Sequence, residues 1–402
     1  MLRPGQGKRA LIHVGGPVET AGDPVLARTM AEALCVRPGE RDATLTHPFH
    51  AYPARLHPEV ARRLVAMIPM SRPATVLDPF CGSGTVLVEA LVAGHRAIGT
   101  DLSPLAIELA GLKTRLTTEA ERRAMVQAAR AVAREAGAMV RAGVRLPVPP
   151  GEARWFAPHT LREVAALASI VLAMGPGFER DALRLLLSSI LVKVSFQASD
   201  SDPRWVTKRL APGAALRFFA RKAFELDCCL AALAKAVPSG APPVDVHVDD
   251  ATVLRTVADA TVDVVMTSPP YAATYDYVTH HARRYAWLGL DPGALRTKEM
   301  GAARWFDVPE VGARRFAREL ASMCAAFARV LRPGGLALVV MADGAAGDRP
   351  LLADEMLARA IQGTGLDLVA RVSQARPVFD RVSRRAFARG SKREHLMAFV
   401  RR

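Results

Sequence analysis

The sequence is poor in residues that could crosslink the chain or hold a metal. Its 402 residues contain five cysteines, with no CxxC pair and no His/Cys array at zinc spacing. An odd cysteine count suits a reducing compartment, so we expect neither disulfides nor a structural metal. No signal peptide is visible, and no apolar run reaches the roughly 18 residues of a membrane span. We therefore expect a cytoplasmic protein with no membrane partner.

The charge is strongly unbalanced toward positive. The formal net charge is +15, carried mostly by arginine. Such a charge favours a polyanionic partner such as nucleic acid, through phosphate contacts and counterion release. An Arg- and Ala-rich composition is also what a GC-rich genome produces without selection for binding, so this alternative stays open.

Apolar periodicity divides the chain into segments. Period-2 or short buried runs predict strands, and 3.6-residue periodicity predicts helices at 57–67 and 85–94 and through most of 115–235. The predicted strands are 74–77, 97–100, 244–248, 262–267, 331–341, 366–372 and 395–400. Alternating strands and helices predict an α/β, doubly wound, mostly parallel seven-stranded sheet with a helical insertion, whose ligands bind at the carboxyl ends of the strands.

This pattern also divides the chain into regions. We expect an irregular N-terminal arm (1–45), a first half of the sheet region (46–114), a helical insertion (115–240) and a second half of the sheet region (241–402).

A glycine loop follows the first predicted strand. In the run DPFCGSG (78–84) the glycines permit a tight turn and let a ligand approach the backbone at the next helix N-terminus. The loop is neither GxGxxG nor a phosphate-binding P-loop, so a nucleoside triphosphate fits poorly. Asp101 ends the next strand, where a carboxylate can accept from two ribose hydroxyls, and Asp249 and Asp250 end the third and can meet an adenine amino group. Each carboxylate alone also fits a helix N-cap or a surface position.

An adenosine ligand without phosphates indicates S-adenosylmethionine. Its carboxylate can rest on the backbone amides of the glycine loop, and Asp78 then faces its amino group. Cys81 lies inside this loop, but methylation at carbon 5 of cytosine typically uses a Pro-Cys pair, which the chain lacks, so we interpret Cys81 as a packing residue.

DPFCGSGT together with TSPPY (267–271) resembles the S-adenosylmethionine-dependent amino-methyltransferases of DNA. HPFHAYPARLHP (47–58) resembles the H-x-Y-P-A-K-F-x-P stretch of one branch, and YDYVTHHARRYAWLG (275–289) and KREHLMAF (392–399) extend the similarity. The resemblance implies a class I methyltransferase-like core, with 46–114 as its cofactor-binding half and 241–402 as its catalytic half, and makes the helical insertion (115–240) a candidate region for target recognition and DNA contact. It places the methionine end of the cofactor near Tyr52, Pro53, Ala54 and Arg55, although a Tyr-Pro turn with a surface Arg fits those residues equally. The full predicted cofactor set is Tyr52, Pro53, Asp78, Pro79, Phe80, Gly82, Ser83, Gly84, Thr85, Asp101, Leu102, Asp249 and Asp250.

The resemblance gives the Ser-Pro-Pro-Tyr motif its chemistry. An exocyclic amine on a base is a weak nucleophile until acceptors draw it toward tetrahedral geometry. Ser268 Oγ and the carbonyl of Pro269 are such acceptors, and the Pro269-Pro270 pair fixes φ and removes a competing N–H. Tyr271 would offer a stacking face, worth about 1–3 kcal/mol per base, toward the cost of flipping the base out of the duplex. A serine in first place favours cytosine N4 over adenine N6.

Polar residues after the longest helical run are candidates for contacting DNA. Ser195, Gln197, Ser199, Arg204 and Lys208 can reach phosphates. Tyr275 and Tyr277 line the base pocket or close its mouth, with ordinary packing at a helix start as the alternative.

We therefore predict a DNA cytosine-N4 methyltransferase acting on a flipped base, with a cognate restriction endonuclease as a further partner. Two alternatives stay open besides adenine N6. One is an RNA base N-methyltransferase, acting on tRNA or rRNA, and the other is a nucleic-acid-binding module with an inactive site.

Overall fold

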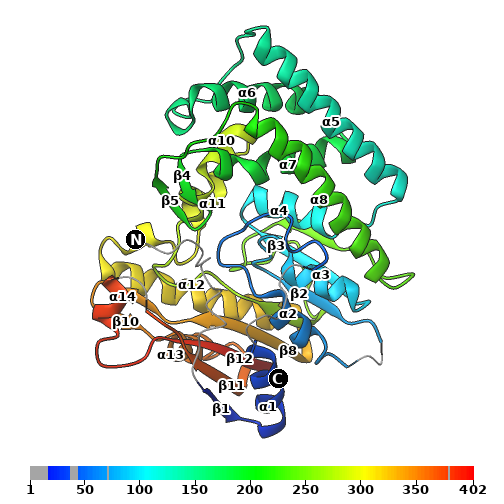
Figure 1. Cartoon of the computed structure of the whole chain (residues 1–402). Helices are drawn as coiled ribbons and strands as arrows, with labels where there is room; N and C mark the ends of the chain where they lie inside the picture. The colour runs from blue at the N-terminus through cyan, green and yellow to red at the C-terminus, as the bar shows by residue number, and fades with distance from the viewer. Residues whose placement is uncertain (1–16, 37–43, 70–71, 379–380) are drawn as a thin grey trace.

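The computed structural model describes residues 17–36, 44–69, 72–378 and 381–402. Its centre is an eight-stranded sheet with the order β1-β11-β12-β8-β7-β2-β3-β6 (Figure 1). The strands are β1 (Val18–Gly22), β2 (Thr75–Asp78), β3 (Arg96–Asp101), β6 (Asp245–Val248), β7 (Val262–Thr267), β8 (Leu331–Ala342), β11 (Leu366–Ala375) and β12 (Arg393–Arg401). All seven predicted strands are found, with ends displaced by at most three residues.

Most of the strands run in one direction. β6, β3, β2, β7 and β8 form parallel pairs, and β11 shares their direction because it lies two antiparallel steps beyond β8. Only β12 and β1 run the other way among these strands. The predicted α/β, doubly wound, mostly parallel fold is confirmed. The chain crosses from β6 at one edge to β7 on the other side of β2, so the order reverses between β2 and β7.

The prediction of seven strands and an irregular arm was wrong for the described part of the N-terminal segment. Residues 18–22 form β1, which pairs antiparallel with β11 and adds the eighth strand. The helix α1 (Pro24–Leu34) follows, capped by Asp23, whose side chain accepts from the amides of Val25 and Leu26. Residues 1–16 and 37–43 of the predicted arm lie outside the described residues.

Helices cover both faces of the sheet, as the alternation of side chains along the strands requires. Val76 and Val264 point to one face, where they pack with α1, α2 (Pro58–Val65) and α3 (Thr85–Val92). Leu77 and Val265 point to the other face and pack with α12 (Pro309–Val330) and α13 (Ala353–Ala360). The site-bearing strands are therefore buried on both sides, and only their carboxyl ends are left for a ligand.

A third core is built from helices beyond the sheet. Its main members are α5 (Glu119–Arg141), α6 (Pro158–Ala173), α7 (Phe178–Val194) and α8 (Ala214–Ala236), joined by α4 (Pro104–Lys113) and α10 (Ala282–Leu288). Figure 1 shows α5 to α8 gathered at one end of the molecule, away from β1 and β11. The domain boundaries at 45, 114 and 240 stay predictions.

Shorter elements complete the fold. They are β4 (Gln197–Ser199), β5 (Asp202–Trp205), β9 (Gly344–Ala346), β10 (Arg349–Leu351), α9 (Tyr277–His280), α11 (Gly293–Lys298), α14 (Arg381–Ala386), η2 (Ala153–Trp155) and η3 (Ala303–Phe306). Within the described residues, the helices are all too short or too polar to span a bilayer.

Candidate functional site

The two sequence motifs lie side by side at the point where the strand order reverses. β2 leads into the glycine loop and β7 leads into Ser268, and the two strands are parallel neighbours. A side-chain hydrogen bond joins their ends, because Thr267 Oγ1 donates to Asp78 Oδ1 at 2.7 Å. Both carboxyl ends therefore open on the same side of the sheet, where open α/β sheets bind their ligands.

A pocket of about 880 Å³, open to solvent, occupies this position. Every predicted cofactor residue except Gly84 lines it, as do Ser268 and Pro270 of the second motif and Tyr277. The lining segments are 52–56, 78–83 with 85, 101–103, 249–252, 268 with 270 and 277, and 295 with 298–300.

The glycine loop needs its glycines for two different reasons. Gly82 (φ +48°) and Gly84 (φ +81°) have left-handed backbones, which side chains disfavour. A Cβ on Gly82 would lie 3.1 Å from the Tyr52 ring, and one on Gly84 would lie 3.1 Å from Ala110 Cα of α4. The loop thus lies between the pocket and α4 and packs closely against α4.

The helix after the loop has an open N-terminus. Gly84 is the N-cap of α3 and supplies no side-chain cap. Thr85, the first helical residue, is buried, lines the pocket, and its Oγ1 has no hydrogen-bond partner. An orphaned hydroxyl beside a helix N-terminus fits an anionic group of a ligand.

Two buried carboxyl groups lie at the strand ends. Burial raises the pKa of Asp78 to about 7, against the hydrogen bonds from Thr267 and the Phe80 amide. Burial also raises the pKa of Asp101 to about 6, although its oxygens accept from the amides of Gly82 (3.0 Å) and Ser103 (2.8 Å). A cationic ligand would relieve the cost of ionising these groups, so this end of the pocket fits a positive charge.

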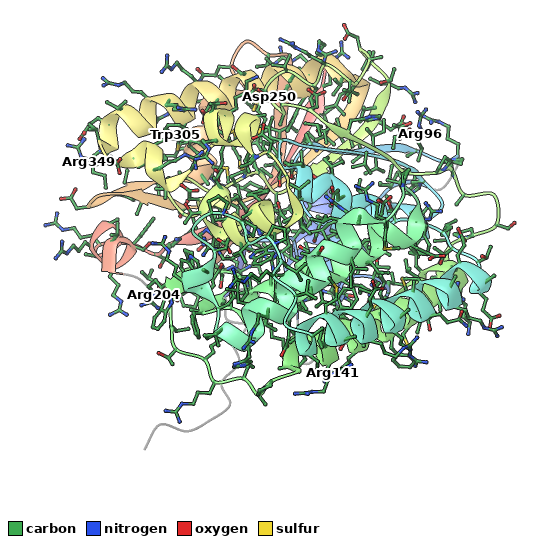
Figure 2. The ribbon with its side chains drawn as sticks, turned by 90° about the horizontal axis from the view of Figure 1, so that it is seen from above. Arg96, Arg141, Arg204, Asp250, Trp305 and Arg349 are labelled. Atoms are coloured by element: carbon green, nitrogen blue, oxygen red, sulfur yellow. The ribbon has the colours of Figure 1, made fainter. Side chains whose placement is uncertain are left out.

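At the third strand end, the predicted cofactor residues Asp249 and Asp250 line the pocket and also accept hydrogen bonds within the protein. Asp249 accepts from the amide and hydroxyl of Thr256, both at 2.7 Å, and from the Asp250 amide. Although burial acts to raise it, these hydrogen bonds lower the pKa of Asp249 overall. Asp250, labelled in Figure 2, is bonded to Thr252 and pairs with Lys298 across the pocket at 3.4 Å. Both aspartates line the pocket, but the hydrogen bonds that Asp249 accepts come from its own loop.

The Ser-Pro-Pro-Tyr motif divides between the pocket and the core. Ser268 and Pro270 line the pocket, whereas Pro269 and Tyr271 are not among the lining residues. Tyr271 packs against the core under α12, and its hydroxyl donates to Glu394 Oε1 at 2.9 Å. Ser268 Oγ lies 3.5 Å from the same hydroxyl. In this arrangement Tyr271 positions Ser268 and does not offer the free stacking face that we predicted.

Aromatic side chains form part of the pocket wall. Tyr277 stacks on Tyr52 with ring centroids 6.0 Å apart, and both line the pocket. Tyr275 adds a third ring 5.8 Å from Tyr277, and His281 lies 4.9 Å from Tyr52. The flat surface expected of Tyr271 is present here instead.

The residues predicted to contact DNA fall into two groups. Ser195 and Gln197 are wholly buried, which corrects their predicted place at the surface. Ser195 Oγ donates to Val192 O at the end of α7, and Gln197 Nε2 donates to Ser199 O and to His280 O.

The remaining three predicted DNA contacts lie on or after a β-hairpin. β4 and β5 pair antiparallel, with Ser199 opposite Asp202. Arg204 is exposed and pairs with Asp202, while Lys208 is half-buried and donates to Val192 O at 2.8 Å. Figure 2 shows Arg204 pointing outward, as Arg96, Arg141 and Arg349 do on other sides of the molecule. These four arginines therefore do not mark out a single binding face.

The sequence analysis missed one segment that lines the pocket. Leu295, Lys298, Glu299 and Met300 line it from α11 and the following turn. Glu299 is buried, accepts from the Tyr277 amide (2.6 Å) and pairs with Arg304 (2.7 Å), and burial raises its pKa to about 7. No sequence motif marks this segment.

Among the described residues, one group has side chains close enough for a metal ion: Asp343, Asp354 and His395. Its atoms already bond one another and the chain, since Asp343 accepts from His395 and from two backbone amides. The expectation of no metal stays a prediction.

Comparison with known proteins gives a family match over part of the chain. Residues 48–143 match the model described as UPF0020, RMKL-like, methyltransferase domain. The chain is 40% identical over 72 residues to the type II methyltransferase M.MvaI of Kocuria varians, which is 17% of this chain and 16% of that protein. It is 39% identical over 51 residues to the tRNA (guanine(10)-N2)-dimethyltransferase of Methanothermobacter thermautotrophicus, 13% of this chain and 15% of that protein. The matches thus span about a sixth of these relatives' lengths.

Solved structures show only distant likeness. TrmN from Thermus thermophilus aligns with a TM-score of 0.36 and 13% identity, over 88% of this chain and 52% of that one. The rRNA methyltransferase aviRa from Streptomyces viridochromogenes aligns with a TM-score of 0.35 and 15% identity, over 91% and 94%. At these scores neither likeness bears on the activity.

Proposed function

We propose that this chain is an S-adenosylmethionine-dependent methyltransferase that modifies an exocyclic amine of a nucleobase, with cytosine N4 in DNA as the leading target. One observation carries the proposal. The glycine loop and Ser268 open into the same pocket from neighbouring strand ends that are bonded to each other through Thr267 and Asp78. The methyltransferase-domain match over residues 48–143 supports it independently.

The residues present fit the cofactor. S-adenosylmethionine carries two positive groups and one carboxylate. Asp78 and Asp101 offer buried carboxyl groups for the cationic part and for the ribose hydroxyls. Thr85 and the uncapped N-terminus of α3 offer an anion site. Tyr52 packs over Gly82 and closes one side of the pocket.

The chemistry supplied by the bound cofactor is a methyl group on a sulfonium, which leaves with the C–S electron pair remaining on sulfur. The attacking amine forms the new N–C bond and afterwards loses a proton to solvent. Ser268 Oγ, which lines the pocket, would accept one amine hydrogen and concentrate the lone pair on nitrogen. The Pro269 carbonyl stays the predicted acceptor for the second hydrogen, although Pro269 is not among the lining residues of this structure. Tyr271, itself held by Glu394, would fix the Ser268 hydroxyl. Tyr277 would stack on the flipped base.

The choice between DNA and RNA rests on the following grounds. The serine of Ser-Pro-Pro-Tyr resembles DNA cytosine-N4 enzymes, and one relative is a type II methyltransferase. The motif order differs from the commonest branch with this motif, in which Ser-Pro-Pro-Tyr often precedes the glycine loop, whereas here it follows. The other relative acts on tRNA, which keeps an RNA base as the second candidate. Adenine N6 is the third. A cognate restriction endonuclease belongs to the proposal only if DNA is the substrate.

The deciding experiment uses methyl-labelled cofactor with the full chain. Duplex DNA, single-stranded DNA, tRNA and rRNA are offered separately, and the labelled polymer is digested to nucleosides and chromatographed. N4-methyl-2′-deoxycytidine from DNA supports the leading target. Label only in RNA would replace it with the second candidate, and cofactor binding without label in any polymer would leave an inactive binding module.

Cofactor affinity should fall as the pH is lowered. The free-enzyme pKa values of Asp78 (about 7) and Asp101 (about 6) are raised, so below pH 7 these groups take up protons that a cationic ligand must displace. We expect the dissociation constant of S-adenosylmethionine to rise between pH 7 and pH 5, by up to about tenfold per pH unit for each linked proton. Calorimetric titration measures it, and a flat profile over this range would contradict the assignment.

The β4–β5 hairpin is proposed as the nucleic-acid contact nearest the pocket. Gln197 ties it to His280 beside the aromatic wall, and its last residue, Trp205, is 53% exposed next to Arg204. Such an exposed indole can stack on an unpaired base. Trp205→Ala should weaken binding of a single-stranded oligonucleotide by about 1–3 kcal/mol, measured by fluorescence anisotropy of the labelled strand.

The control for this variant is Phe224→Ala. Phe224 is an aromatic residue of similar exposure (58%) on α8. Equal losses in the two variants, or none in either, would show that the hairpin is not the contact.

A further inference from the structure

Lys113 is a buried cation without a carboxylate partner. It ends α4, its residue is 0% exposed, and its Nζ contacts Ser83 Oγ of the glycine loop at 3.4 Å. In the described part of the chain no carboxylate lies within 4.0 Å of it. Buried charges are normally paired, so an ammonium with one hydroxyl partner calls for an explanation.

The surroundings of Lys113 oppose its charge. Burial, helped by the positive charge of Arg55, lowers the pKa of Lys113 to about 7. The other titratable groups that act on it or feel it are Cys229 of α8, whose thiol pKa burial raises to about 11, and His50, whose pKa burial lowers. The carbonyl end of α4 and the Ser83 hydroxyl are its nearby stabilisers. None of these groups is a carboxylate that could pair with the Lys113 ammonium.

The geometry places that anion in the pocket. α4 packs directly beneath the glycine loop, because a Cβ on Gly84 would meet Ala110, one turn before Lys113. Ser83 touches Lys113 and also lines the pocket. On the same loop, Thr85 Oγ1 is buried without a partner at the start of α3, and Arg55 lines the pocket nearby. Two positive side chains, a helix N-terminus and an unpaired hydroxyl thus surround one end.

The opposite charge lies in the same pocket, at Asp78, which begins the glycine loop, and at Asp101, which accepts from the Gly82 amide. A ligand that joins a carboxylate to a cationic group fits a pocket with both kinds of charge beside one loop, as the amino-acid part of S-adenosylmethionine does.

We propose that Lys113, acting through Ser83, is the counter-charge for the carboxylate of the cofactor's amino-acid moiety. This inference rests on the proposed function. Lys113 is thereby a positioning residue, and its lowered pKa gives the site a second property: above neutral pH, binding of the carboxylate draws a proton onto the lysine. Cofactor affinity should then decline on the alkaline side as well as on the acid side.

The test compares two ligands that differ only in the carboxylate. S-adenosylhomocysteine carries it, and its decarboxylated analogue keeps the ammonium but lacks it. Calorimetry at about pH 8.5, where a lysine of pKa about 7 is neutral, in buffers of different ionisation enthalpy gives both affinity and proton uptake. Wild type should take up close to one proton with S-adenosylhomocysteine and much less with the analogue.

Lys113→Met should lower the affinity for S-adenosylhomocysteine about tenfold or more, leave the analogue within about twofold, and abolish proton uptake. The matched control is Lys222→Met, a partly buried lysine of α8 that bonds Phe49 O and Glu225. Equal losses for both ligands would mean that Lys113 only supports the loop, and unchanged discrimination would overturn the proposal. If Lys113→Met does not fold, proton uptake by the wild type decides by itself.

The outcomes separate this inference from the function. A wild type that binds neither ligand removes the proposed cofactor. A wild type that binds both equally, without proton uptake, removes only the role of Lys113.

Discussion

Ser268→Ala should lower the rate of methyl transfer at least about 10²-fold while changing the affinity for S-adenosylhomocysteine by less than about twofold. The reason is that the serine hydroxyl would act on the amine in the transition state, whereas among the described residues its hydrogen-bond partner is Tyr271 and not the glycine loop proposed to hold the cofactor. Ser268 lines the pocket, and its hydroxyl lies 3.5 Å from Tyr271 Oη, which Glu394 fixes. Single-turnover transfer of labelled methyl and calorimetric titration of the product cofactor measure the two quantities.

The control is Ser189→Ala, which removes a hydroxyl that bonds only Leu186 O on α7. It should leave both quantities unchanged. If Ser268→Ala transfers methyl at the wild-type rate, the acceptor role passes to backbone groups alone and the mechanism proposed for this motif fails.

Local sequence signals were sufficient for the core of the site. The glycine loop could be predicted because its backbone needs residues that tolerate positive φ, and it directly follows a short buried strand. Because parallel strands end on the same edge, the strand pattern also implied that residues 78 and 268 would be near each other. The hydrogen bond from Thr267 to Asp78 shows that the two strand ends are in contact.

Features that depend on tertiary partners were not predictable from the sequence. β1 is five residues long and mostly exposed, and it is a strand because β11 offers an edge, not because its own sequence alternates. Ser195 and Gln197 look like surface residues by polarity, yet their hydrogen bonds to Val192 O and His280 O let them be buried. A polar side chain needs hydrogen-bond partners when it is buried, but the sequence does not show where in the fold those partners lie.

The same limit applies to the pocket's charged groups. Lys113 is one lysine at the end of an apolar helix, and Glu299 is one acid after a short helix. Neither lies in a motif. Only packing shows that α4 lies under the glycine loop and that α11 covers the pocket, so burial, which sets the pKa of each group near 7, could not be inferred.

Asp101→Asn should lower cofactor affinity about 10²-fold, the largest binding effect that we expect from a single isosteric change. The Asp101 carboxylate accepts from the amides of Gly82 and Ser103 and lines the pocket, so it would join the glycine loop to the ribose hydroxyls of the proposed cofactor. The asparagine side chain keeps one acceptor oxygen for one of these two backbone amides. Its NH₂ group then faces the N–H of the other amide, so that hydrogen bond is lost. The loss of one charged acceptor is worth about 1.5–3 kcal/mol, which corresponds to about 10- to 150-fold in the dissociation constant.

Asp245→Asn is the matched control for this change, because Asp245 lies on the neighbouring strand β6 and pairs only with Arg96 at the surface. Its cofactor affinity should equal that of the wild type in calorimetric titration. The pH dependence adds a second criterion: with Asp101 gone, the fall in affinity near pH 6 should disappear while the part near pH 7 that belongs to Asp78 persists. An Asp101→Asn variant that binds the cofactor with wild-type affinity would place the ribose elsewhere, and with it the orientation on which Ser268 depends.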